Sequence, residues 1–163
     1  MTAGTSRILK PLIDGVIAMI KQHTFFGTTD LVFSDIKIYF TTNKLQIPDG
    51  MYPCVFIYIP DINYTDYGVG RGRRRWDVDV TFSIMFKSFK NESGGEILEV
   101  YKEEVDRMFQ LHPRLDGFLD NETGVQRANV TSVSHEFAMG SNFILDKLDF
   151  DVEISLLPHN LDG

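Results

Sequence analysis

Two runs of alternating apolar and polar residues constrain the fold of this 163-residue chain most strongly. They are WDVDVTFSIMFK at positions 76–87 and ILDKLDFDVEISL at positions 144–156. A period of two is typical of a half-buried β-strand, because successive side chains point to opposite faces of a sheet. Each run therefore predicts a strand with one face in a core and the other facing solvent or a partner. Asp146 interrupts the apolar face of the second run.

Two other segments have the spacing of amphipathic helices. The first spans residues 5–23, with Thr5 or Ser6 as a possible cap and with Pro11 favouring a regular helix that begins near residue 10. The second ends at residue 111, because Pro113, two residues further on, is not compatible with a continuing helix. Ser93 and Glu96 have the spacing of a capping box at its start.

The remaining segments predict shorter strands and one long loop. Residues 36–40 and 125–140 read as strands, the latter with a bulge near 131–133, and residues 54–59 read as a central strand covered on both faces and closed by Pro60. Residues 61–75 are rich in Gly and Tyr and predict a flexible loop. The chain is therefore expected to be a single α+β domain over residues 1–163, with two helices on one face of a mostly antiparallel sheet.

The sequence contains no catalytic motif that we recognise. The segment GVGRG at 68–72 is rich in glycine but precedes a strand, so it cannot direct a helix N-terminus at a phosphate group. Cys54 is the only cysteine, and the four histidines are far apart in the sequence. We therefore expect no enzyme activity, no cofactor and no metal site.

The N-terminal segment lacks the features of a secretory signal, and no apolar stretch approaches the roughly 20 residues that cross a membrane. A soluble intracellular protein without a membrane partner is the expectation from these features.

The arginine cluster consists of Arg71, Arg73, Arg74 and Arg75, in a chain of net charge -7. Three interpretations remain open. The cluster keeps the end of a strand solvated, it contacts carboxylates of another subunit, or it contacts the backbone of a nucleic acid.

An acidic strip of Asp149, Asp151 and Glu153 occupies the polar face of the last predicted strand. A straight strand cannot wrap a cation, so a strip that faces solvent or a partner is favoured over a metal site. Together with the arginines, the strip gives the molecule a basic edge and an acidic edge. Copies with unlike edges can associate head to tail, and such contacts close into rings when the rotation allows it.

The order of these elements resembles the tail-terminator proteins of long-tailed bacteriophages, which are also called tail-completion or tail-to-head joining proteins. The resemblance is carried by the N-terminal helix, the Gly/Arg loop before RRRWDVDVTFSIMF, the helix GEILEVYKEEVDRMFQL and the final hairpin. It covers nearly the whole chain and is one of pattern, without a diagnostic motif.

The resemblance implies a structural virion protein at the head-proximal end of the tail, present in the host cytoplasm during assembly. A homo-hexameric ring is expected to cap the tail tube, to stop its polymerisation and to join it to the head connector. The resemblance also implies that DNA passes through the lumen without specific binding. Alternatives are another neck protein such as a head-completion or stopper protein, a tube- or sheath-associated subunit, and an uncharacterised α+β enzyme.

Overall fold

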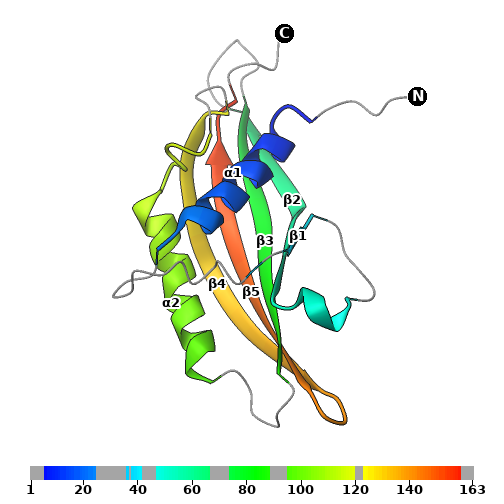
Figure 1. Cartoon of the computed structure of the whole chain (residues 1–163). Coiled ribbons are helices and arrows are strands. Elements are labelled where there is room, and N and C mark those ends of the chain that lie inside the picture. The colour runs from blue at the N-terminus through cyan, green and yellow to red at the C-terminus, as the bar shows by residue number, and fades with distance from the viewer. Residues whose placement is uncertain are drawn as a thin grey trace, which may run out of the picture.

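The computed structural model describes residues 6–24, 36, 38–41, 47–66, 74–88, 95–119 and 123–158 of the chain. The elements follow in the order α1 (Leu9–Gln22), β1 (Ile38–Phe40), a 3₁₀ turn η2 (Asp49–Met51), β2 (Cys54–Asp66), β3 (Arg74–Ser88), α2 (Glu96–Leu111), β4 (Val125–Met139) and β5 (Ile144–Leu156). Both helices lie on one face of a single five-stranded sheet (Figure 1), which confirms the predicted α+β class. We call the opposite face of the sheet the outer face.

The strands are arranged in the order β1-β2-β3-β5-β4. All neighbouring pairs are antiparallel except β1 and β2, which run parallel. The last two strands form the predicted hairpin, and its turn is closed by the Gly140 N–H, which donates to the Phe143 carbonyl at 2.8 Å. Among the described strands, β4 is the long strand at one end of this order and β1 the short strand at the other.

The core lies between the helices and the sheet, and it confirms the predicted alternation of β3 and β5. Phe82 and Phe150 are opposite each other in the register, both 0% exposed, and their rings stack with centroids 5.5 Å apart. The helices contribute a matching set of buried side chains, among them Leu12, Val16, Met19, Ile20, Leu98, Tyr101, Val105, Met108 and Phe109. Burying each such large apolar side chain contributes roughly 1.5–3 kcal/mol, so these two strands anchor the domain.

Helix α1 begins close to the predicted position, but the start of helix α2 differs from the prediction. Helix α1 begins at Leu9, with Pro11 in its first turn, and the Ser6 hydroxyl accepts a hydrogen bond from the Lys10 N–H at 3.0 Å. The capping box predicted for α2 is wrong, because Glu96 is the first helical residue and the N-cap is Gly95. Gly95 has a φ of 57°, a left-handed conformation that glycine adopts without a steric penalty.

The predicted flexible loop over residues 61–75 is wrong at both of its ends. Residues 61–66 continue β2 and residues 74–75 begin β3, so only 67–73 remain outside the described residues. Pro60 does not close the strand, because the register shifts between Tyr58 and Asp61 and the irregularity accommodates a proline. Beyond it, Tyr64 and Trp76 meet edge to face with ring centroids 5.3 Å apart, which favours continued pairing of the two strands.

Two strand predictions need a smaller correction, and one is confirmed. The strand expected at residues 36–40 spans Ile38–Phe40, and β2 is second from the edge of the sheet rather than central. The first four residues of β2 are nevertheless buried on both faces, since Phe40 stacks on Phe56 with ring centroids 5.0 Å apart. The bulge predicted near 131–133 is present as a register shift between Val130 and Ser132.

Candidate interaction surfaces

Among the described residues, the polar contacts of Arg74, at the start of β3, are with its own hairpin. Its Nε donates to Asp66 Oδ1 at 3.1 Å, and its guanidinium carbon lies 5.9 Å from the centroid of the Tyr64 ring. The side chain remains 56% exposed, so it can also reach a second carboxylate. Arg71 and Arg73 of the predicted cluster lie outside the described residues.

Arg75 lies on the outer face, at the end of the sheet where β5 finishes. A terminal nitrogen of its guanidinium donates to Asp77 Oδ2 at 3.3 Å. A second arginine, Arg127 of β4, lies on the same face and is opposite Ser155 in the register. The two arginines border a shallow hollow of about 310 Å³, which is lined by Arg75, Gln126, Arg127, Ser155 and Leu157. This hollow is a basic site that the sequence did not predict.

Seven carboxylates of described residues lie on the rest of the outer face. They belong to Asp61, Asp77, Asp79, Glu136, Asp149, Asp151 and Glu153. Three of them form one row across the sheet, because Asp61 is opposite Asp79 and Asp79 is opposite Glu153. Like charges in directly opposed positions destabilise a sheet, so this row has a cost in folding stability.

Hydrogen bonds from neighbouring strands hold part of this acidic face in place. The Ser155 hydroxyl donates to Asp77 Oδ1 at 2.8 Å and the Ser132 hydroxyl donates to Asp151 Oδ2 at 2.9 Å. Asp149 accepts a hydrogen bond from Ser83 and lies 3.5 Å from the Lys147 ammonium group.

The row of Asp61, Asp79 and Glu153 is different. In the part of the chain that the structure describes, no cation lies within ion-pair distance of these three carboxylates.

The structure therefore brings together the predicted Asp149, Asp151 and Glu153 on one exposed face, as the alternation of β5 indicated. It adds Asp61, which the sequence analysis missed because it assigned that residue to a loop. It also adds Arg127, whose partner strand could not be identified from the weaker alternation of β4. The signal that would have revealed Asp61 is the continued alternation of Ile62 and Tyr64 beyond the proline.

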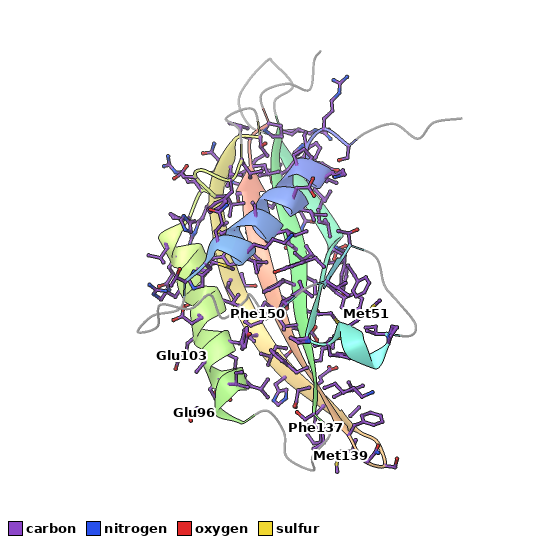
Figure 2. All side chains as sticks on the ribbon, viewed as in Figure 1. Met51, Glu96, Glu103, Phe137, Met139 and Phe150 are labelled. Atoms are coloured by element: carbon purple, nitrogen blue, oxygen red, sulfur yellow. The ribbon has the colours of Figure 1, made fainter. Side chains whose placement is uncertain are left out.

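Among the described residues, exposed large apolar side chains lie on α2, on β4 and near the opposite edge of the sheet. On β4, Val133, Phe137 and Met139 are 40%, 65% and 66% exposed. At the opposite edge, Met51 and Tyr58 are each 37% exposed. Figure 2 shows Phe137 and Met139 at the far end of the β4–β5 hairpin and Met51 on the other side of the sheet.

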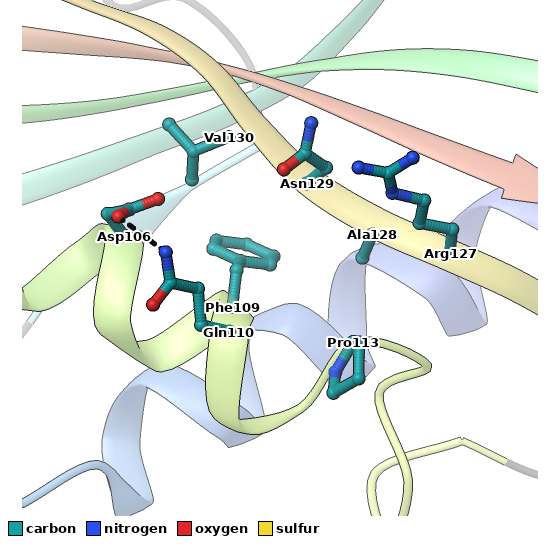
Figure 3. A pocket seen from close by; sticks show the side chains of 8 residues that line it. All are labelled: Asp106, Phe109, Gln110, Pro113, Arg127, Ala128, Asn129 and Val130. Carbon is teal, nitrogen blue, oxygen red and sulfur yellow. Dashed lines mark hydrogen bonds between the residues drawn. The ribbon is translucent and has the colours of Figure 1, made fainter.

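A second hollow of about 330 Å³ lies between α2 and β4 (Figure 3). Its lining consists of Asp106, Phe109, Gln110, Pro113, Arg127, Ala128, Asn129 and Val130. Gln110 Nε2 donates to Asp106 Oδ2 at 3.0 Å on one side, and Arg127 extends along the strand on the other. An apolar floor between one acidic and one basic group suits a side chain of another protein, which could make both apolar and polar contacts there.

Two polar pairs join neighbouring elements of the fold, one of them buried and the other part-buried. His23 Nε2 and Glu104 Oε2 are 2.7 Å apart and join the end of α1 to α2, and Arg107 donates to the same carboxylate at 3.0 Å. His135 Nε2 and Asp146 Oδ1 are 2.8 Å apart and join β4 to β5. The Asp146 carboxylate that interrupts the apolar face is thus hydrogen-bonded, as a fully buried polar group needs to be.

The described residues contain no group of three or more His, Cys, Asp or Glu side chains that could hold a metal ion. The Cys54 side chain is buried, and this burial raises the pKa of its thiol to about 11. In the part of the chain that the structure describes, neither helix has the length and apolar character required to cross a membrane.

Comparisons with known proteins give no further assignment, since no protein-family model matches the chain and no curated protein has a significantly similar sequence.

Proposed function

We propose that this chain is a tail terminator of a long-tailed bacteriophage, a structural protein without enzymatic activity. In this proposal six copies form a ring that stacks on the last ring of tail-tube protein, stops its polymerisation and presents its other side to the head connector. The protein acts in the host cytoplasm during assembly and then stays at the head-proximal end of the tail. The resemblance in element order supports the proposal, as does the α+β fold with both helices on one face.

The observation that carries the proposal is the acidic outer face. Seven carboxylates lie on this side of the sheet, and among the described residues only Asp77 and Asp149 have a cation within ion-pair distance. A surface of this charge repels the phosphates of DNA, so a channel lined by it lets DNA pass without binding. The need to repel DNA would explain why the protein keeps a row of like charges that lowers the folding stability of the isolated chain.

The arginine cluster serves a protein partner in this proposal. A guanidinium group forms two parallel hydrogen bonds to a carboxylate, which suits contacts between subunits or with the tube. Arg74 and Arg75 already bind carboxylates of their own hairpin, so docking would exchange or extend these contacts.

Electron microscopy of tails provides the test. Particles produced without this protein should carry overlong tail tubes, because nothing then stops polymerisation. The triple variant Arg73→Ala, Arg74→Ala, Arg75→Ala should fold normally yet fail to restore normal tube length.

A matched variant controls for the loss of three positive charges. Arg7→Ala, Lys10→Ala, Arg114→Ala removes the same charge from exposed positions outside the cluster and should cap tubes normally. Tubes of normal length that lack heads would indicate a neck protein of the head side instead. If the arginine triple variant caps as well as the unchanged protein, the role of the cluster is refuted.

A further inference from the structure

We propose that the hollow between α2 and β4 binds an acidic segment of another protein, which places a carboxylate on Arg127 and an apolar side chain on the floor of the hollow. The inference goes beyond the proposed function, because it concerns a site on the chain whatever assembly the chain enters. In the proposed function the segment would belong to the tail-tube protein, and only this last point rests on that function.

Both walls of the hollow lie within continuous stretches of the chain that the structure describes. Residues 106–113 provide the helix wall and residues 127–130 the strand wall. The Ala128 N–H donates to the Pro113 carbonyl at 2.6 Å, which fixes the chain at the end of α2 against the strand. This contact belongs to the fold itself, so the hollow is preformed and a ligand does not have to order its walls.

The apolar part of the hollow suits one large side chain. The buried Phe109 and Ala128 form the floor, which lies between α2 and the strand in Figure 3. Val130 is half-buried and Pro113 is exposed, so a side chain that enters the hollow covers apolar surface on both walls. The volume of about 330 Å³ is sufficient for one such side chain. Removing this apolar surface from water favours binding.

The polar groups at the rim differ in how far they are already used. The Asp106 carboxylate accepts a hydrogen bond from the Gln110 side chain at 3.0 Å. Arg127 is exposed, and no carboxylate of the described residues lies within ion-pair distance of it, whereas Arg75 already binds Asp77. Arg127 therefore has the largest unused donor capacity in the hollow. A carboxylate fits it best, because a guanidinium group donates two parallel hydrogen bonds to the two carboxylate oxygens.

Arg127 can be reached from both sides of β4. It lines the hollow next to α2, and it also lines the hollow on the outer face of the sheet. A segment that crosses the edge of the sheet at this point can therefore meet the guanidinium group while its neighbouring side chain enters the hollow next to α2.

The surroundings favour a carboxylate of a protein over the phosphates of a nucleic acid. Glu153 of β5 is opposite Asn129, which is the next outer-face residue of β4 after Arg127. A nucleic-acid backbone laid over Arg127 would bring further phosphates against Glu153 and the other carboxylates of the outer face, which repel them. A protein segment can instead present one carboxylate beside one apolar side chain, and this combination matches the hollow.

Titration with short peptides, followed through the backbone amide signals in NMR spectra of the full-length protein, tests the site. The probes are acetyl-Ala-Phe-Glu-Ala-amide and the neutral analogue with Gln in place of Glu. The acidic peptide should bind at least tenfold more tightly and shift the signals of residues 106–112 and 126–130. Equal affinities would overturn the proposal. Absence of saturable binding at about 10 mM, where a Kd of about 1 mM gives near saturation, would overturn it as well.

Two substitutions with opposite expected effects locate the carboxylate. Arg127→Gln should weaken binding of the acidic peptide at least tenfold and leave binding of the neutral peptide unchanged. Asp106→Asn removes a negative charge from the rim and should tighten binding of the acidic peptide by roughly two- to threefold. Arg7→Gln is the matched control, since it removes one positive charge from an exposed position that does not line the hollow. Equal losses for Arg127→Gln and Arg7→Gln would refute the site.

The remaining arms identify the occupant. A short DNA duplex that binds the unchanged protein but not Arg127→Gln would assign the site to nucleic acid and overturn the proposal. Self-association in sedimentation equilibrium that Arg127→Gln abolishes would identify a second copy of the chain as the occupant, which overturns it too. Tail length reports on the tail-terminator role separately. Tubes of normal length in the absence of the protein would refute that role, while the peptide result would still stand.

Discussion

Replacing Asp79 by asparagine should stabilise the protein, because this residue has a carboxylate directly opposite it on each side. Asp61 faces it from β2 and Glu153 from β5. Each directly opposed pair contributes roughly 0.2–1 kcal/mol, so we expect Asp79→Asn to raise the free energy of unfolding by about 1 kcal/mol. Asparagine keeps the shape of the side chain, which restricts the change to charge. For a chain of this size that corresponds to an increase in Tm of about 2–4 °C.

The assay is urea and thermal unfolding at two ionic strengths. Repulsion between partly exposed carboxylates is strong at about 0.01 M salt and screened at about 1 M, where the Debye length falls from about 30 Å to about 3 Å. The gain in stability should therefore shrink as salt is added.

Asp151→Asn is the control, since Asp151 is opposite Thr81 and Ser132 and accepts a hydrogen bond from the Ser132 hydroxyl at 2.9 Å. The control should be neutral or destabilising. If Asp79→Asn is no more stable than the unchanged chain at low salt, or if its gain is independent of salt, the carboxylate row is not under electrostatic strain and our reasoning fails.

Three further predictions concern the core and the helix layer. Phe150→Ala should cost about 3–5 kcal/mol in urea unfolding, because it removes a fully buried ring that stacks on Phe82. Gly15→Ala should destabilise the chain in the same assay, since a Cβ there would lie 2.6 Å from the Leu119 side chain. The raised pKa of Cys54 gives a contribution to stability that is present below pH 9 and is lost as the pH rises through about 11, so thiol alkylation at pH 8 should require unfolding.

The fold could be predicted from the sequence where one face of an element is apolar and the other polar. The strands around Phe82 and Phe150 show this pattern clearly, so their faces and their place in the core were correct. The same reasoning placed Asp149 and Asp151 together on an exposed face.

The sequence pattern failed where a local signal opposed strand pairing. Pro60 and the polar residues after it indicated a loop, but proline is tolerated at an irregularity near the edge of a sheet. The pairing of Asp66 with Arg74 and of Tyr64 with Trp76 then extends both strands of the hairpin. The opposition of Asp61 and Asp79 could not be foreseen, because it depends on a register that no local pattern specifies.

The contacts of the two described arginines suggest how docking would depend on salt. Arg74 and Arg75 each bind a carboxylate of the same hairpin, and exposed ion pairs of this kind contribute at most about 1 kcal/mol each. If each arginine exchanges its own carboxylate for one on a neighbouring subunit, the free energy of association changes little, unless the new contact excludes water. If the arginines dock the proposed tail terminator onto the tube through exposed ion pairs, capping should therefore weaken as salt is added, and a capping activity that is independent of salt would exclude this role.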